Sequence, residues 1–479
     1  MLELFAFYWP IATTLLLGVI PIVLAATVIL HKRNENAAIA WVGLILLSPV
    51  IGSVAYLLFG INRIRRRARR TRPPSGLPDR SHDRQAHTAR AGAAGAIDRL
   101  INNLAPNPAV GGNQVELLRN GDEAYPAMIA AIDGATRSVM LSTYIFKRDA
   151  TGMEFVDALA RAQARGVDVR VLVDGVGQMY SFPSIVSALR HADIPFARYM
   201  HSFWPWRMPY LNLRSHRKIL VVDGEIGFTG GINISHNNVL VTAPKRPLSK
   251  RLVRDLHFRI TGPVVGQLSD AFADDWNFTT DETLEGAQWF PPLGDHGAVV
   301  ARAIPTGPHE TIDRTRWILH AAILEARERI AIQTPYFLPD EILVSALRIA
   351  SIKGVEIDIM IPERSNLRFV DWAVRARLDE LLHDGCRVWL GPPPFNHAKL
   401  LMVDREWALI GSSNWDPRSL RLNFELNVEC RDGAFVDALS KAFDAERKQA
   451  RRLTLAELGA RSLSVRLRDG VARLFSPYL

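Results

Sequence analysis

The sequence predicts an α/β protein that is built from two similar halves and preceded by two membrane-spanning helices. Short apolar strands alternate with amphipathic helices from about residue 113 onward, and the second half repeats the order of the first. Residues 4–30 and 37–60 contain no charged side chain. These observations divide the chain into a membrane hairpin, a linker, a first half and a second half, at residues 1–62, 63–112, 113–292 and 293–479.

Each of the two uncharged segments is long enough to cross a bilayer core, which takes about 20 residues. Tyr8, Trp9, Trp41 and Tyr56 lie toward the segment ends, where interfacial aromatic residues are expected. A cleaved signal peptide is the rival interpretation of the first segment, but that segment lacks a basic start and its apolar run is longer than signal peptides have. The sequence therefore predicts a two-helix transmembrane hairpin.

A run of arginines follows the second segment directly: Arg63, Arg65, Arg66, Arg67, Arg69, Arg70 and Arg72. Because basic residues flank the cytoplasmic ends of membrane helices, this run predicts that both termini and the globular part lie in the cytoplasm. The run either serves as a topology signal alone or also attracts anionic head groups. The net charge of +9 favours an anionic partner, either nucleic acid or anionic lipid.

The apolar periodicity predicts the elements of both halves. The linker is rich in Pro, Gly, Ala and Arg, and one short helix is expected within it at residues 96–104. In the first half we expect strands at 115–118, 139–145 and 167–173, and helices at 122–132 and 152–165. In the second half we expect a helix at 321–329 and strands at 330–334 and 355–361. Such alternation is typical of βαβ units, so the sheet is expected to be mostly parallel.

One pattern occurs twice, at residues 215–233 and 396–414. In each copy His-x-Lys is followed by four residues, an Asp, six residues, two small residues, one further residue and an Asn. The matched positions are His216, Lys218, Asp223, Gly230, Gly231 and Asn233, and then His397, Lys399, Asp404, Gly411, Ser412 and Asn414. His397 lies 181 positions after His216, and every other pair keeps this offset. Two copies in one frame indicate a duplicated functional unit.

The pattern suits the chemistry of a phosphate ester. The His and the Lys stand at the start of an apolar run, residues 217–222 or 398–403, that is expected to form a strand, so both side chains point to one face. Lys and Asn can hold phosphate oxygens while His attacks phosphorus or delivers a proton. The small-residue pairs that end in Gly231 and Ser412 are expected to let backbone N–H groups approach the anion. The alternative, that the His residues are ordinary core side chains, does not account for two copies in register.

The duplicated His-x-Lys motif resembles that of the phospholipase D superfamily. The resemblance implies two pseudo-symmetric α/β halves packed around one active site, a phosphohistidine intermediate, and no metal or other cofactor. Carried over to this chain, it makes His216 and His397 the nucleophile and the acid/base pair. Lys218 and Lys399 would hold the phosphate, joined by Asn233 and Asn414.

The carboxylates of the candidate site fall into two groups. Asp223 and Asp404 complete the catalytic motif, but they lie seven residues after their His, beyond the strand, so we expect them to hold the motif together. The carboxylate that orients each imidazole is expected later in the chain, where Asp255 and Glu425 are the candidates. Glu425 lies 11 residues past its Asn, whereas Asp255 lies 22 past its own, and the closer spacing favours Glu425.

Features outside the motif narrow the resemblance to the bacterial cardiolipin synthases of this superfamily. They are the two membrane segments, the arginine run, and the stretches at residues 212–215, 334–337, 414–419 and 423–425. The resemblance implies transfer of a phosphatidyl group from one phosphatidylglycerol to another, which gives cardiolipin and glycerol at the bacterial cytoplasmic membrane. The implied partners are membrane phospholipids and the bilayer, with no nucleic acid expected.

Other functions of the same fold stay open at this point. A phospholipase D-type hydrolase and a nuclease use similar chemistry, and the basic charge allows the latter. Much of that charge lies beside the membrane segments, however, and the aromatic-and-basic pattern typical of single-strand binders is missing. A degenerate scaffold would need lost catalytic residues, and all six His, Lys and Asp positions are present. The order in which the two imidazoles act also stays open.

Two further segments have two interpretations each. Residues 203–210, with Trp204 and Trp206, form either an interfacial lip or packing between the halves. Residues 451–475 mix Arg with Leu, Val and Phe, which favours either a basic amphipathic helix on the membrane surface or a segment packed against the second half. Cys386 and Cys430 are the only cysteines and are far apart in the chain, so neither a disulfide framework nor a zinc site is indicated.

Overall fold

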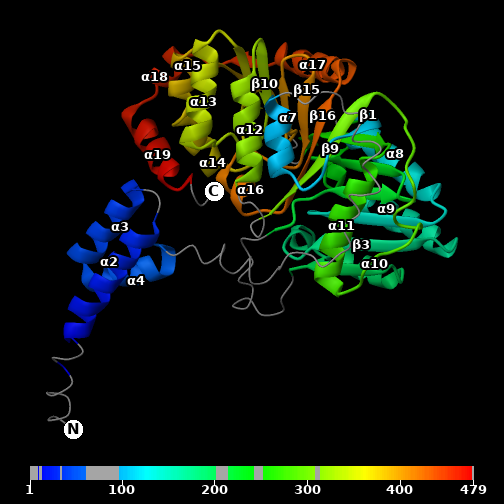
Figure 1. Ribbon diagram of the computed structural model, residues 1–479, viewed down its shortest axis with the longest axis horizontal. Coiled ribbons are helices and arrows are strands. Elements are labelled where there is room, and N and C mark those ends of the chain that lie inside the picture. The colour runs from blue at the N-terminus through cyan, green and yellow to red at the C-terminus, as the bar shows by residue number, and fades with distance from the viewer. Residues whose placement is uncertain are drawn as a thin grey trace. The chain divides into compact units, whose positions relative to one another are not determined.

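One mixed sheet runs through both halves of the protein in the computed structural model (Figure 1). The structure describes residues 9, 13–32, 35–60, 96–200, 214–241, 252–307 and 313–476. Over these residues the sheet has 15 strands in the order β17-β12-β11-β10-β14-β15-β16-β9-β1-β8-β6-β5-β2-β3-β4. The predicted arginine run, most of the predicted linker and the segment at 203–210 lie outside the described residues.

The strands of the two halves correspond in sequence and in position. Those of the first half are β1 (Val110–Arg119), β2 (Ser138–Thr143), β3 (Asp168–Asp174), β4 (Phe196–Tyr199), β5 (Ile219–Val222), β6 (Ile226–Gly230), β7 (Val253–Arg254) and β8 (Leu256–Thr261). Those of the second half are β9 (Val299–Thr306), β10 (Arg329–Gln333), β11 (Glu356–Pro362), β12 (Arg387–Gly391), β13 (Phe395–Asn396), β14 (Leu400–Val403), β15 (Trp407–Gly411), β16 (Glu425–Arg431) and β17 (Arg451–Arg452). The halves meet at the antiparallel β1–β9 pair, and the order of strands outward from that pair is the same on both sides.

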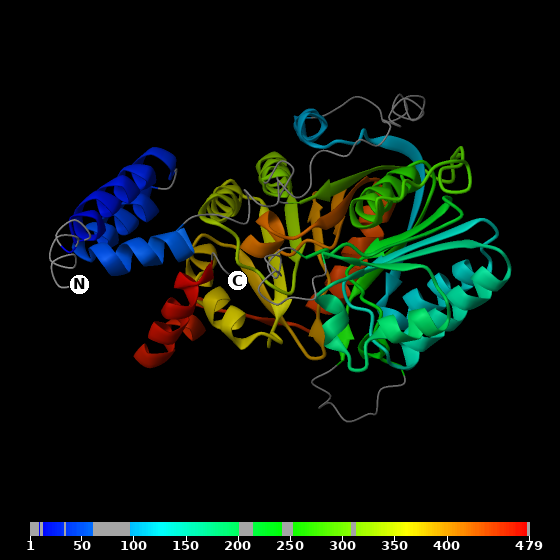
Figure 2. The ribbon, with the colours of Figure 1, turned by 90° about the horizontal axis from the view of Figure 1, so that it is seen from below.

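Helices cover both faces of the sheet (Figure 2). In the first half they are α8 (Asn120–Asp133), α9 (Ala150–Ala164), α10 (Ile185–His191) and α11 (Val265–Thr280). In the second half they are α12 (Arg314–Glu325), α13 (Glu341–Ile352), α14 (Arg368–Arg375), α15 (Leu378–His383), α16 (Pro417–Arg421), α17 (Gly433–Arg447), α18 (Leu455–Gly459) and α19 (Leu463–Leu474). The apolar core of the first half lies between α8, α9, α10 and one face of the sheet, and an equivalent core fills the second half. The predicted helix at 96–104 is present as α7 (Ala96–Leu104), which packs against α12.

The expectation of a mostly parallel sheet is wrong. Parallel pairing within the large sheet is confined to β2–β3–β4 and β10–β11–β12, where helices cross between the strands. The other pairs are antiparallel, because connections such as those of β5–β6 and β14–β15 are short hairpin turns that leave no room for a crossover. The predicted helix at 321–329 also begins and ends earlier, as α12, because residues from Arg329 onward pair as β10.

Residues 1–70 form a separate unit. Its described elements are η1 (Leu15–Val19), α2 (Ile20–His31), α3 (Glu35–Leu47), α4 (Pro49–Ala55) and η2 (Tyr56–Gly60). Ala25, Val28, Ile45 and Tyr56 make up its small core. Pro49 starts α4 and separates it from α3, because proline is suited to the first turn of a helix and not to its interior. Among the described helices, none combines the length and the apolarity that crossing a bilayer requires.

A buried ion-pair network connects β9, β16 and α7 near the centre of the sheet. Arg302 of β9 is fully buried, and its Nε lies 3.0 Å from Glu429 Oε2 on β16. Its Nη2 lies 3.7 Å from Asp98 Oδ1 on α7. Trp407 Nε1 donates to the other oxygen of Glu429 at 2.9 Å. The network therefore holds β16 in place, and β16 begins with the candidate site residue Glu425.

Arg302→Ala is expected to lower the free energy of unfolding by about 3–5 kcal/mol, because it removes the fully buried cation and leaves Glu429 and Asp98 with only Arg431 nearby. The exposed Arg259–Glu116 pair, at 3.5 Å, provides the matched control, and Arg259→Ala is expected to change stability by less than about 1 kcal/mol. Urea unfolding of the purified protein in detergent measures both effects from the shift in midpoint. Equal effects of the two substitutions would contradict the structural role of the network.

Candidate active site

Each motif histidine is positioned by a short pairing between the two halves. Ser215 bridges Phe424 of the second half, and His216 N donates to Phe424 O at 2.8 Å. In the equivalent arrangement β13 pairs in parallel with β7, and His397 N donates to Arg254 O at 2.7 Å. Both imidazoles therefore lie at the junction of the halves. The His and Lys residues stand just before β5 and β14 and not on these strands as expected, because the backbone there is engaged with the other half.

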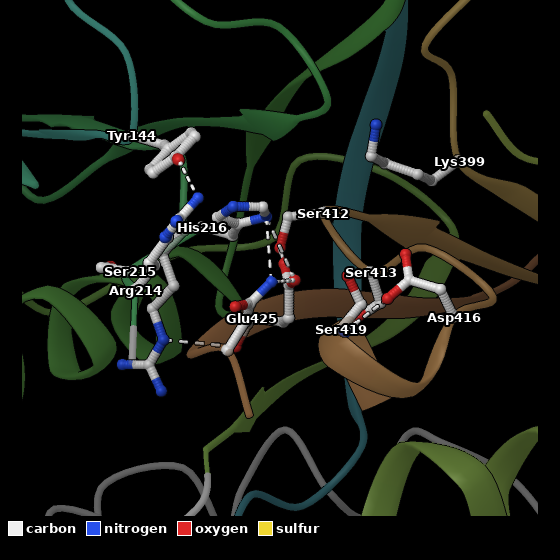
Figure 3. Close-up of polar contacts among 12 residues, drawn as sticks. Tyr144, Arg214, Ser215, His216, Lys399, Ser412, Ser413, Asp416, Ser419 and Glu425 are labelled. Carbon is white, nitrogen blue, oxygen red and sulfur yellow. Dashed lines mark hydrogen bonds and ion pairs between the residues drawn. The ribbon is translucent and has the colours of Figure 1, made fainter. Parts of the chain in front are cut away.

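Each imidazole faces a buried carboxylate from the opposite half. His397 Nδ1 lies 2.8 Å from Asp255 Oδ2. His216 Nδ1 lies 3.4 Å from Glu425 Oε1 (Figure 3). Both carboxylates are at most 2% exposed. Because a carboxylate can only accept a hydrogen bond, these contacts favour the tautomer with the proton on Nδ1, which leaves Nε2 for a substrate. The two candidate carboxylates thus occupy equivalent places, and Asp255 makes the shorter contact although chain spacing favoured Glu425.

Lys218 and Lys399 are buried beside these pairs. Lys218 Nζ donates to His216 O at 2.7 Å, and Lys399 Nζ lies 2.8 Å from His397 Nδ1 and donates to His397 O. Burial lowers the pKa of both lysines, to about 7 for Lys399, while the carboxylates of both halves oppose the shift. Since each ammonium group lies in the field of both carboxylates, the two copies of the motif form one charged cluster.

Burial also lowers the pKa of both imidazoles. Glu425 opposes this shift at His216. At His397 the neighbouring Lys399 adds to it, Asp255 opposes it, and the pKa falls to about 4. Burial would raise the pKa of Asp255 and Glu425, but their cationic neighbours outweigh it and hold both values below the ordinary range. In the free protein at neutral pH the site therefore presents two neutral imidazoles backed by two carboxylates.

Asp223 and Asp404 lie at the far ends of β5 and β14 from the imidazoles. The carboxylate of Asp223 accepts hydrogen bonds of 2.7–3.2 Å from the backbone N–H groups of residues 136–138. The carboxylate of Asp404 accepts bonds of the same lengths from residues 327–329. Both residues occupy hairpin turns, with φ of 52° and 53°. They tie each turn to the start of β2 or β10, which agrees with the expectation that they hold the motif together.

The expectation that Gly231 and Ser412 offer N–H groups to an anion is wrong. Both N–H groups donate at 3.0 Å to the main-chain carbonyls of the residues that follow the two orienting carboxylates. Gly231 instead makes room for Asp255, because a Cβ at this position would lie 2.1 Å from Asp255 Oδ1. Ser412 Oγ donates to Glu425 Oε2 at 2.6 Å. Both small residues therefore support the carboxylates.

The two motif asparagines have different surroundings. Asn233 Oδ1 accepts a hydrogen bond from Ile145 N at 3.1 Å and so helps to hold the segment after β2. Asn414 is buried and lines a small cavity together with Lys399. Its Oδ1 has no hydrogen-bond partner among the described residues. The Asn414 amide therefore faces the same small cavity as a motif lysine.

Sequence reasoning missed two residues that support His216. The ring of Tyr144 lies 4.2 Å from the imidazole, centre to centre. Tyr144 follows β2, and a polar residue at the carboxyl end of a parallel strand was a usable signal. Arg217 is 1% exposed and donates to Glu425 O at 3.2 Å and to Asp275 Oδ1 at 3.0 Å. It is the variable residue within His-x-Lys, so the pattern itself gave no sign of its role.

This arrangement can perform phosphoryl-type transfer by the protein's own side chains. Two Nε2 atoms are available to attack or to move a proton, and two ammonium groups are available to hold a phosphate. In the part of the chain that the structure describes, no group of three or more His, Cys, Asp or Glu side chains is placed to hold a metal ion.

Comparisons with known proteins agree with this chemistry. Residues 128–276 and 319–447 match the family described as cardiolipin synthase, PLD-like domain, and residues 19–60 match the one described as phospholipase D-nuclease N-terminal. Cardiolipin synthase A of Pseudomonas fluorescens is 33% identical over 480 residues, which cover 97% of each chain. The major cardiolipin synthase of Bacillus subtilis is 32% identical over 478 residues, which cover 95% of this chain and 97% of that one.

A solved structure shares the fold. The crystal structure of phosphatidylserine synthase from Haemophilus influenzae matches with a TM-score of 0.61 at 16% sequence identity, over 80% of this chain and 100% of that chain. The family match spans more than half of the present sequence, and the relatives align over nearly all of it. The chain therefore belongs to the cardiolipin synthase family of phospholipase D-like phosphatidyltransferases.

Proposed function

We propose that the enzyme makes cardiolipin by moving a phosphatidyl group between two phosphatidylglycerol molecules through a covalent phosphatidyl-histidine. The supporting observation is that two half-buried imidazoles, one from each half, belong to one cluster with both motif lysines. A double displacement at phosphorus needs an attacking group and a proton donor on opposite sides of the same phosphate. The cluster supplies both from the duplicated motif.

In the first step, Nε2 of neutral His216 attacks the phosphorus of one phosphatidylglycerol. The bond from phosphorus to the glycerol head-group oxygen breaks, and protonated His397 gives its proton to that oxygen. The negative charge of the bound phosphodiester raises the pKa of His397 from about 4, so this imidazole gains its proton as the substrate binds. The 2.8 Å contact with Asp255 stabilises the imidazolium and suits His397 to the acid role. The superfamily resemblance implies the same order.

In the second step, neutral His397 takes the proton from a free glycerol hydroxyl of a second phosphatidylglycerol. The oxygen of that hydroxyl attacks phosphorus, and the bond to His216 breaks. Cardiolipin leaves, and His397 is protonated again, so protons balance over the cycle. Throughout, Lys218 and Lys399 hold the non-bridging oxygens, with Asn233 and Asn414 as further donors. No metal or other cofactor enters either step.

We also propose that the N-terminal unit attaches the enzyme to the bacterial cytoplasmic membrane as a multi-pass hairpin, with the catalytic part in the cytoplasm. Leu30, Ile39 and Leu47 in this unit expose 78%, 70% and 90% of their surface, which is unfavourable in water. The family match at residues 19–60 supports the attachment, and the arginine run supports the orientation. A membrane location raises the local concentration of the lipid acceptor, so that transfer can outcompete hydrolysis.

Vesicles of phosphatidylglycerol test the reaction and its order. The purified wild type is expected to release cardiolipin and glycerol in equal amounts. His216→Ala is expected to form neither cardiolipin nor an adduct, because the nucleophile is gone. His397→Ala is expected to slow cardiolipin formation by about 10²–10⁴-fold and to accumulate a phosphatidyl adduct on His216, because proton transfer is lost while attack remains. Lipid analysis and mass spectrometry of the intact protein measure these outcomes.

Three results would change this proposal. Phosphatidic acid without cardiolipin would identify a hydrolase. An adduct in His216→Ala, located on His397, would reverse the two roles. Cardiolipin formation that survives removal of either imidazole would end the phosphohistidine mechanism.

Asp255→Asn is expected to lower kcat by about 10–100-fold with little change in KM, because the imidazolium of His397 loses its counter-charge. Asp223→Asn is the matched control, since it removes a half-buried, hydrogen-bonded carboxylate of the same motif outside the site. It is expected to lower the free energy of unfolding by about 1–3 kcal/mol and to leave kcat per folded molecule unchanged. Steady-state kinetics with a parallel unfolding curve separates the two. A kcat loss of similar size in Asp223→Asn would show that the motif aspartate acts in catalysis.

The pH dependence of substrate binding follows from Lys399. Its lowered pKa means that the ammonium form is present below about pH 7 and is lost as the pH rises through that value. KM for phosphatidylglycerol is therefore expected to increase above about pH 7. The alkaline decrease of kcat is expected at higher pH, because the bound anion raises the pKa of Lys399 in the enzyme–substrate complex. Lys399→Arg keeps its charge over this range and is expected to lose the alkaline rise in KM. A flat KM from pH 6 to 9 in the wild type would contradict the assignment.

A further inference from the structure

The outward face of α19 is apolar along its whole length. Leu463, Leu467, Val471 and Leu474 are 53–72% exposed, and Phe475, directly after the helix, is 50% exposed. Their spacing of three or four residues places them on one face of the helix. A continuous apolar strip of this kind marks a surface that another apolar phase covers.

The opposite face of α19 is fixed to the second half of the protein. Asp469 and Ala472 are buried, and the helix packs against α14. Arg461 and Arg468 both bind the carboxylate of Asp469, at 2.6 and 2.7 Å. The guanidinium of Arg468 also lies 4.4 Å from the ring centre of Trp372 on α14. These contacts set the rotation of the helix: one face packs against the second half, as one interpretation of residues 451–475 expected, and the other face is exposed.

Arginines border the apolar strip on both sides. At 100° per residue, Arg466 and Arg473 fall along one edge of the strip and Arg468 along the other, and all three are exposed. The acidic residue within the helix, Asp469, is buried and already paired. The outward surface of α19 therefore combines an apolar centre with positive edges.

The apolar strip continues onto the start of α14. Phe369 is 37% exposed, and its ring lies 5.7 Å from that of Phe475, centre to centre. Leu367, just before the helix, is 50% exposed. We call the five α19-side residues together with Leu367 and Phe369 the α19 strip.

We propose that the α19 strip lies in the head-group region of an anionic bilayer, as a second membrane contact of this chain. Charge identifies the occupant: anionic head groups complement the exposed Arg466 and Arg473, whereas a second copy docked by the same face would bring like charges together. The proposal rests on the proposed function, which places both substrates in a bilayer. The α19 strip would thus bind the catalytic part to the lipid surface, in addition to the proposed attachment through residues 1–60.

A fluorophore on the strip tests its immersion. In the full chain, Leu467→Cys is labelled with an environment-sensitive maleimide dye, while Cys386 and Cys430 are buried and burial raises the pKa of Cys386 to about 11, so they stay unlabelled. Arg405→Cys, at an 85% exposed position in the β14–β15 turn, is the matched control. In phosphatidylglycerol vesicles containing spin-labelled lipid, the dye at 467 is expected to be quenched at least about 2-fold more than the dye at 405. The difference is expected to shrink in phosphatidylcholine vesicles.

A paired substitution tests the consequence for activity. Leu467→Asp with Val471→Asp is expected to reduce cardiolipin formation on vesicles by about 10-fold, because negative charge is placed where lipid phosphate lies. In detergent micelles, where no bilayer must be engaged, the activity and the unfolding midpoint are expected to match the wild type. Both positions are exposed, so the fold does not depend on them.

The outcomes distinguish failure of this proposal from failure of the proposed function. Equal quenching at 467 and 405 would overturn it, as would a blue-shifted dye at 467 that lipid cannot quench, which would mean that protein covers the strip. Vesicle activity that the paired substitution leaves intact would also overturn it. Absence of cardiolipin formation by the wild type in both vesicles and micelles would instead sink the proposed function, whatever the dye reports.

Discussion

The site depends on two ion pairs in which each half supplies the carboxylate that faces the imidazole of the other half. Asp255 of the first half faces His397 of the second, and Glu425 of the second half faces His216 of the first. Neither half alone holds an oriented imidazole, so the duplication yields one site and not two. The backbone pairings at Ser215–Phe424 and β7–β13 bring the partners together, because each lies directly beside a His and a carboxylate residue.

Burial gives this cluster its chemical character. It lowers the pKa of the imidazoles and the lysines, while the carboxylates stay ionised because cations surround them. Isolated buried charges are unfavourable, so the cluster is stable only as a set of mutually paired groups. In the proposed mechanism, the arriving phosphodiester adds negative charge, which raises the pKa of the imidazoles and lysines and couples substrate binding to protonation of one imidazole. The site is thereby arranged in advance for charge that appears only with the substrate.

The two halves have the same order of strands but differ in residues that surround the two imidazoles. Thr143 and Thr334 make the same hydrogen bond to the carbonyl two residues on, which places Pro335 at the position of Tyr144. His216 thus has a close aromatic neighbour on that side that His397 lacks at the same position. Gly231 gives space to an aspartate, whereas Ser412 donates to a glutamate. These departures from symmetry give the two imidazoles unequal surroundings, which fits the proposed division into a nucleophile and an acid.

The sequence alone determined what depends on local pattern: the alternation of strands and helices, the duplicated motif, and the part of Asp223 and Asp404 in holding it together. It also named Asp255 and Glu425, but not which imidazole each would face. That pairing was decided by tertiary structure, because it joins residues more than a hundred positions apart. The contacts of Gly231 and Ser412 were also decided there, because their N–H groups pair with main-chain carbonyls of other segments. The sheet is mostly antiparallel because short hairpins such as β5–β6 and β14–β15 connect strands that the predicted βαβ units did not include. Tertiary structure also decided which face of α19 is exposed. The composition of the helix was compatible with packing and with membrane contact, and the ion pairs of Asp469 fix the face that packs.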